Sequence, residues 1–186
     1  MIKQTNKMGL FSIKKSNGFK VLDLFCGCGG MSLGFKRQGF EIIGGIDFDK
    51  PSIETFKKNI GNGLLYDLSD DEWVTNFKRI SKNKNVDVLI GGPPCQGFSL
   101  TGTRQFDDDR NKLYRSIFVG ARELNPKVIL IENVRGMATL YGGRAKQEVI
   151  RLFAELGYNV KSKIIDSANF FVPQHRQRLF FVATKS

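Results

Sequence analysis

Apolar residues along the chain alternate between short β-branched runs and longer segments with helical spacing. The runs predict strands at residues 20–25, 41–46, 64–66, 86–90, 127–131, 160–165 and 179–183. The segments between them predict helices at 31–38, 50–59, 72–81, 113–124 and 147–156. Repeated strand–helix units predict an α/β fold, with a mostly parallel sheet, right-handed crossovers and helices on both faces.

Two polar segments of the 186-residue chain lie outside this pattern, one at the N-terminus and one in the middle. Residues 1–18 carry four lysines and no acid, which predicts a flexible basic tail before one domain at 19–186. Residues 97–112 form a long polar connection, and connections of this length are usually functional, often as lids. No apolar run approaches the ~20 residues of a membrane helix, so we expect no membrane partner.

Charge and cysteine content narrow the function. The net charge of +11 favours a negatively charged partner, most commonly nucleic acid. Three cysteines and no signal-peptide pattern indicate free thiols in a reducing compartment. Cys26 and Cys28 lack the further ligands that zinc needs, so we expect no metal.

A glycine-rich turn follows the first predicted strand and begins a helix. Gly27, Gly29 and Gly30 allow a ligand to approach the backbone near the helix N-terminus. A dinucleotide site is one interpretation, but its fingerprint requires a further glycine where this chain has Ser32.

Carboxylates follow the successive strands around this turn. Asp23, Asp47 and Asp67 occur at the predicted ends of three strands. They repel a pyrophosphate and suit a ligand that has a ribose, an amine and a positive charge. S-adenosylmethionine fits this description, whereas a turn that serves only packing is the alternative.

A cysteine preceded by two prolines follows the fourth predicted strand. Pro93 and Pro94 restrict the backbone directly before Cys95, at the sheet edge where open α/β sheets bind ligands. This placement predicts a nucleophilic thiol, although an isolated cysteine is more often a small packing residue.

Taken together, the motifs resemble those of the cytosine-C5 DNA methyltransferases over residues 19–184. The matching segments occur in family order: Asp23–Gly30 with Gly34-Phe35, Asp47-Phe48-Asp49, Asp67-Leu68, Gly92–Ser99, Asp109-Arg110 with Leu113, Glu132-Asn133-Val134, and Gln174–Arg178. Asn111 stands where the family usually has glycine. Several motifs in order rarely arise by chance.

The resemblance implies a Rossmann-like S-adenosylmethionine-dependent methyltransferase fold with a seven-stranded sheet. S-adenosylmethionine would be the methyl donor and S-adenosylhomocysteine the product. The implied catalytic residues are Cys95, whose thiolate adds to cytosine C6; Glu132, which binds the N3/N4 edge; Arg178, which holds O2; and Arg176, which supports that pocket.

The same resemblance implies residues for the cofactor and for DNA. Phe25 would face the adenine, Asp47 the ribose and Asp67 the adenine amino group. The other implied cofactor residues are Gly27, Gly29, Gly30, Phe48, Leu68, Pro93 and Leu113. Gln96, Ser99 and Arg104 would contact double-stranded DNA around a flipped cytosine.

The family usually continues into a target-recognition domain and a last motif, and nothing in this chain resembles either. We therefore expect the isolated chain to be inactive, as a split subunit that needs a second polypeptide, a truncation or a fragment. The expected setting is a bacterial restriction–modification system, with a cytoplasmic, nucleoid-associated enzyme. Two alternatives are a non-catalytic, regulatory adenosylmethionine-binding module and an RNA cytosine-C5 methyltransferase.

Overall fold

The computed structural model describes residues 14–70, 72–81, 84–94 and 112–185, with only the backbone of residues 112 and 113. The strands are β1 (Lys20–Leu24), β2 (Glu41–Asp47), β3 (Gly63–Leu65), β4 (Val88–Gly91), β5 (Val128–Val134), β6 (Asn159–Asp166) and β7 (Gln177–Thr184). The α-helices are α1 (Gly30–Arg37), α2 (Lys50–Asn59), α3 (Trp73–Ile80), α4 (Lys112–Leu124) and α5 (Arg144–Glu155). The 3₁₀ helices are η3 (Arg135–Ala138), η4 (Leu140–Gly143) and η5 (Ser167–Phe170).

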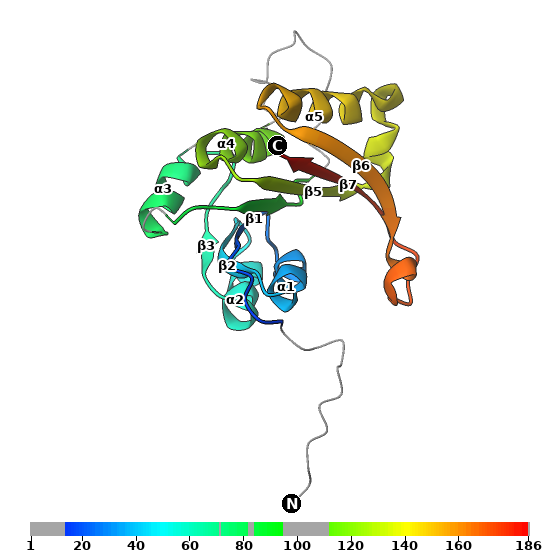
Figure 1. Cartoon of the computed structure of the whole chain (residues 1–186). Helices are drawn as coiled ribbons and strands as arrows, with labels where there is room; N and C mark the ends of the chain where they lie inside the picture. The colour runs from blue at the N-terminus through cyan, green and yellow to red at the C-terminus, as the bar shows by residue number, and fades with distance from the viewer. Residues whose placement is uncertain (1–13, 71, 82–83, 95–111, 186) are drawn as a thin grey trace, which may run out of the picture.

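One seven-stranded sheet organises these elements, in the order β3-β2-β1-β4-β5-β7-β6. The pairs from β3 to β5 are parallel, whereas β7 runs antiparallel to both β5 and β6 (Figure 1). The mostly parallel seven-stranded sheet of the prediction is confirmed.

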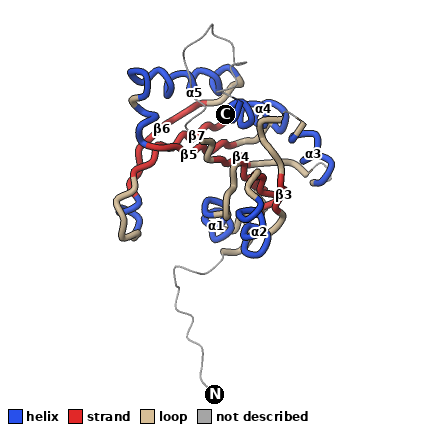
Figure 2. The backbone as a smooth tube through the Cα atoms, turned by 180° about the vertical axis from the view of Figure 1, so that it is seen from behind, coloured by secondary structure: helices blue, strands red, loops and turns tan. Residues whose placement is uncertain are grey.

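Helices cover both faces of the sheet, as predicted. Helices α1 and α2 lie on one face, and α3, α4 and α5 lie on the other (Figures 1 and 2). The larger core forms beneath α3–α5, where Trp73, Phe77 and Ile117 pack against strand residues such as Leu22 and Leu89. The smaller clusters beneath α1 and α2 bury Val21, Ile90, Phe56 and their neighbours.

The ends of α2 show how local sequence fixes a helix. The Asp49 side chain accepts a hydrogen bond from the Ser52 amide (3.0 Å), and Pro51 occupies the first turn. At the other end, Lys36 Nζ donates to the Ile60 carbonyl (2.8 Å) and satisfies a terminal acceptor. The predicted bounds of this helix, 50–59, are those observed.

The amino-terminal segment is partly attached to the domain. The Lys14 amide donates to the Arg37 carbonyl and the Asn17 amide to that of Gly39, each at 3.0 Å. The rest of the predicted tail, residues 1–13, lies outside the described residues. Within the described ranges, no helix has the length and apolar character needed to cross a bilayer.

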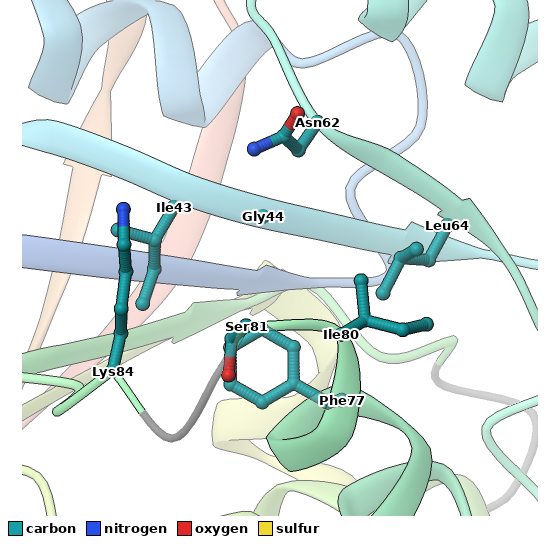
Figure 3. Close-up of a pocket in the computed structure, with 8 residues that line it drawn as sticks. All are labelled: Ile43, Gly44, Asn62, Leu64, Phe77, Ile80, Ser81 and Lys84. Carbon is teal, nitrogen blue, oxygen red and sulfur yellow. The ribbon is translucent and has the colours of Figure 1, made fainter.

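A pocket of about 270 Å³ opens beside the start of β3 and the end of α3 (Figure 3). Its lining consists of Ile43, Gly44, Asn62, Leu64, Phe77, Ile80, Ser81 and Lys84. None of these is a predicted site residue, and the β2 residues in the lining precede Asp47, the last residue of that strand.

Candidate functional site

The antiparallel β7 brings late residues to the edge where the parallel strands end. The register pairs Val134, the last residue of β5, with Arg178 near the start of β7. The carboxyl ends of β1, β2, β4 and β5 therefore lie at the same sheet edge as the amino end of β7. This edge is where open α/β sheets bind their ligands.

The glycine turn after β1 has three residues in the left-handed region of the backbone. Gly27 and Gly29 have φ values of 50° and 92°, and Phe25 adopts 58°, which is unusual for an aromatic residue. A Cβ on Gly29 would lie 2.6 Å from Ile60 Cγ1, so no larger residue fits there without a shift. The space beside Gly27 and Gly30 is open within 4 Å, which leaves room for a ligand against the turn.

Asp47 joins this turn to the end of β2. Its Oδ2 accepts a hydrogen bond from the Gly27 amide (2.8 Å), and its Oδ1 accepts one from the Asp49 amide (3.0 Å). Each carboxylate oxygen retains a further lone pair for a ligand hydroxyl. The adjacent Phe48 is 69% exposed, so an aromatic face is open beside the carboxylate. A glycine turn, a carboxylate and an aromatic face together suit an adenosyl ligand such as the predicted cofactor.

The predicted residues after β3 differ in exposure. Asp67 is exposed, and its Oδ1 accepts a hydrogen bond from the Ser69 amide (2.9 Å). Leu68 is buried in the larger core, and its carbonyl accepts a hydrogen bond from Ser116 Oγ. The Asp67 carboxylate is thus accessible to a ligand, whereas the Leu68 side chain serves the core.

Asp23 lies one residue inside β1, fully buried beneath the turn. Ser32 Oγ, on α1, donates a hydrogen bond to Asp23 Oδ2 (2.6 Å). Burial raises the pKa of Asp23 to about 7 despite this hydrogen bond. Burial, with the nearby Asp23 and Asp47 carboxylates, also raises the pKa of the Cys26 thiol far above its ordinary value. Cys26 is therefore a neutral packing residue, in the small cluster of Ile53, Phe56 and Ile60.

Two of the predicted catalytic residues are in direct contact. Arg178 Nε lies 2.9 Å from Glu132 Oε1, and both side chains keep about a quarter of their surface exposed (22% and 25%). A Cβ on Gly92 would lie 3.5 Å from Glu132 Oε2, so the backbone after β4 runs beside this carboxylate. The pair therefore stands next to the segment that leads to Cys95.

Arg176 lies in the connection before β7 and is exposed. Its amide donates to Asp166 Oδ1 (3.1 Å), and the same carboxylate group contacts His175 Nδ1 through Oδ2 (3.2 Å). A hydrogen bond from the Ala168 amide, together with these two contacts, lowers the pKa of Asp166, and the bond to the Arg176 amide fixes the backbone of the connection there.

A buried carboxamide with no role predicted from the sequence, that of Asn133, lies beside the pair. Asn133 Nδ2 donates to the Pro93 carbonyl (2.8 Å) and to the Tyr114 hydroxyl (3.0 Å). The signal was present, because an amide within an apolar strand needs buried partners. The partners themselves are 40 and 19 residues away along the chain.

The remaining predicted residues cannot be compared with the structure. Cys95, Gln96, Ser99 and Arg104 lie outside the described residues, as does most of the predicted lid at 97–112. The backbone of Leu113 belongs to α4, while its side chain is outside the description. Pro93 is buried at the end of the described segment.

Sequence comparison matches residues 19–186 to a family model described as C-5 cytosine-specific DNA methylase. The Type II methyltransferase M.AgeI of Thalassovita gelatinovora is 38% identical over 166 residues, which cover 87% of this chain and 38% of that protein. The Type II methyltransferase M1.HphI of Haemophilus parahaemolyticus is 39% identical over 172 residues, covering 88% and 45%. This chain thus spans less than half the length of these two relatives.

Solved structures show the same fold. A DNA modification methyltransferase encoded within an E. coli prophage superposes with a TM-score of 0.74 at 31% identity, covering 90% of this chain and 47% of that one. The S. pombe Dnmt2 methyltransferase gives a TM-score of 0.69 at 26% identity, covering 90% and 51%. Each shares the described sheet and extends well beyond the matched region.

Proposed function

Because this chain belongs to the family of C-5 cytosine-specific DNA methylases, we propose that it is the catalytic part of an enzyme that methylates C5 of cytosine in DNA. The observation that carries this proposal is the contact of Glu132 with Arg178 beside Gly92, directly before the Cys95 segment. The relatives are named Type II methyltransferases, and we assign this chain a role in a restriction–modification system of that type.

The cofactor proposal rests on the residues around the glycine turn. Asp47 would bind the ribose hydroxyls, Asp67 the adenine amino group, and Phe25 and Phe48 the adenine ring. Bound S-adenosylmethionine supplies an electrophilic methyl group. Gly27 and Gly30 leave the space that such a ligand needs.

Three side chains would carry the chemistry on cytosine. The Cys95 thiolate adds to C6, which makes C5 nucleophilic. Glu132 binds the N3/N4 edge and donates a proton to N3, while Arg178 holds O2 by a charge-assisted hydrogen bond. The base must leave the duplex stack to reach them, at a cost of a few kcal/mol. In the absence of a base, Glu132 and Arg178 satisfy each other.

DNA binding requires more than these residues. The net charge of +11 favours a polyanion, and Gln96, Ser99 and Arg104 would contact the backbone around the flipped base. The relatives are more than twice as long as the shared region. We assign target recognition to sequence beyond that region, on this or a second polypeptide, acting on DNA of the bacterial nucleoid.

Covalent trapping tests the proposal. Duplex DNA containing 5-fluorocytosine is incubated with S-adenosylmethionine and the chain, alone and with a candidate second polypeptide. We expect an adduct stable to denaturing gels with the second polypeptide, lost in Cys95→Ser and kept in the control Arg151→Ala on the exposed surface of α5. A parallel arm with 5-fluorocytosine RNA tests the alternative substrate. Adenosylmethionine binding without an adduct in any arm would favour the regulatory alternative.

A further inference from the structure

A chain of buried hydrogen bonds links four elements behind the Glu132–Arg178 pair. Asn133 is 2% exposed, and its Nδ2 donates to both the Pro93 carbonyl and the Tyr114 hydroxyl. Its Oδ1 accepts from the Val134 amide (2.8 Å). The Tyr114 hydroxyl in turn donates to Met137 Sδ (2.9 Å). The chain therefore runs from the segment after β4 through β5 and α4 to η3.

The bonding pattern fixes which way the carboxamide faces. The Pro93 carbonyl can only accept, so the amide nitrogen of Asn133 must point toward it. The second N–H of that nitrogen then requires another acceptor, and the Tyr114 hydroxyl is placed to be one. With both N–H groups and the oxygen engaged, the carboxamide has one satisfied orientation.

Tyr114 and Pro93 flank the segment that carries Cys95. Pro93 is two residues before Cys95. Tyr114 lies in the first turn of α4, which begins at Lys112. One buried side chain, Asn133, thus bonds to both flanks. Misplacement of a reacting group by about 1 Å can slow catalysis by about 10²-fold, so this fixation matters for chemistry.

We propose that Tyr114 is a positioning residue for the methyl-transfer reaction, acting through Asn133 on the Pro93 carbonyl. The inference rests on the proposed function. Without the hydroxyl, one Asn133 N–H is buried without an acceptor, a state that is strongly disfavoured. The carboxamide then turns away or the backbone shifts, and the approach to Cys95 loses its fixed position.

The test compares two buried tyrosine hydroxyls. Tyr114→Phe removes the hydroxyl bonded to Asn133. The control Tyr158→Phe removes a hydroxyl that donates to the Pro126 carbonyl (2.7 Å). Pro126 precedes β5 and Pro93 follows the parallel strand β4, so the two lie at opposite edges of the sheet. Hydrogen exchange of a peptide spanning Val88–Gly92 reads out the local fixation. Function is measured as the rate of 5-fluorocytosine adduct formation and as the affinity for DNA. Both are measured on whichever form forms the adduct, the chain alone or the chain with a second polypeptide.

We expect Tyr114→Phe to raise exchange at Gly91 and Gly92 by about fivefold, with no change in Tyr158→Phe. The adduct rate should fall by about tenfold with DNA affinity within about twofold. Combining Tyr114→Phe with Asn133→Ala should be no slower than Asn133→Ala alone, because both remove one linkage.

Two results would overturn the positioning role while leaving the proposed function intact. One is unchanged hydrogen exchange in Tyr114→Phe. The other is a double variant whose adduct rate falls by the product of the losses in Tyr114→Phe and Asn133→Ala. If the unsubstituted chain forms no adduct under any condition, the proposed function fails and the catalytic role fails with it. The exchange measurement separates these results, because it requires no turnover.

Discussion

Arg178 Nε and Glu132 Oε1 lie 2.9 Å apart across the antiparallel pair of β5 and β7. The two residues are 46 positions apart in the sequence, and only the insertion of β7 beside β5 places them together. Because each side chain is about a quarter exposed, the pair is accessible to a base edge. Its role should therefore lie in recognition more than in stability.

Replacing Arg178 by alanine should separate these two roles. We expect the unfolding free energy to fall by less than about 1 kcal/mol, since partly exposed pairs contribute little. The adduct rate should fall by about 100-fold, the scale of losing one charge-stabilising donor. Urea unfolding and 5-fluorocytosine trapping measure the two effects.

Arg151→Ala is the matched control, because Arg151 pairs with Glu148 and Glu155 on the exposed surface of α5. It should leave the adduct rate unchanged. A loss of stability of several kcal/mol in Arg178→Ala would instead assign the pair to the fold.

Asp23 should make the stability of the domain fall as the pH rises from about 4 to about 7. The folded chain keeps the proton to about pH 7, whereas an unfolded aspartate releases it near 3.8, so the folded state binds more protons in this window. The loss is complete above pH 7 and amounts to about 4 kcal/mol at most. Urea unfolding between pH 5 and 8 measures it.

Asp23→Asn keeps an acceptor for Ser32 and removes the ionisation. This variant should show a flatter pH profile and greater stability than the native chain at pH 8. Asp49, Asp70, Asp87 and Asp166 have lowered pKa values and act in the opposite direction, below the measured range. Equal slopes in the two proteins would show that Asp23 is ionised in the folded state.

The sequence predicts every described strand and α-helix within about three residues, because each segment keeps its own apolar period. It does not predict that β7 lies between β5 and β6, since an apolar run reads alike in parallel and antiparallel pairs. The predicted strands leave thirteen residues between them, enough for a parallel crossover, whereas the observed strands leave ten, and so short a connection favours an antiparallel pair.

In the candidate site, too, some residues are predictable from the sequence and others are not. Glu132 and Arg178 are evident from their motifs, but Tyr114 reads as an ordinary core position of an amphipathic helix. Its hydroxyl acquires a role only through Asn133 and Met137, which belong to other elements. Long-range polar contacts of this kind have no local signature.

Two adjacent glycines in β2 should respond very differently to alanine. A Cβ on Gly45 would lie 2.4 Å from Phe56 Cζ, at the edge of a fully buried ring, whereas one on Gly44 would lie 3.3 Å from Phe77 Cε2 beside the pocket (Figure 3). We expect Gly45→Ala to cost about 1–3 kcal/mol or more by overpacking, and Gly44→Ala less than about 1 kcal/mol. Thermal unfolding compares them, and similar losses would mean that Phe56 moves aside.

Thiol labelling should report cofactor binding without turnover. Cys28 is exposed in the glycine turn, whereas Cys26 is buried with a raised pKa, so iodoacetamide at pH 8 should modify Cys28 and spare Cys26. S-adenosylmethionine should slow the labelling of Cys28 by about fivefold at saturation, because the ligand covers the turn. Asp47→Asn should weaken this protection, since Asp47 holds the Gly27 amide and is the proposed partner of the ribose hydroxyls. Glu155→Gln, on the exposed surface of α5, is the control. Equal labelling with and without S-adenosylmethionine would place the cofactor away from this turn.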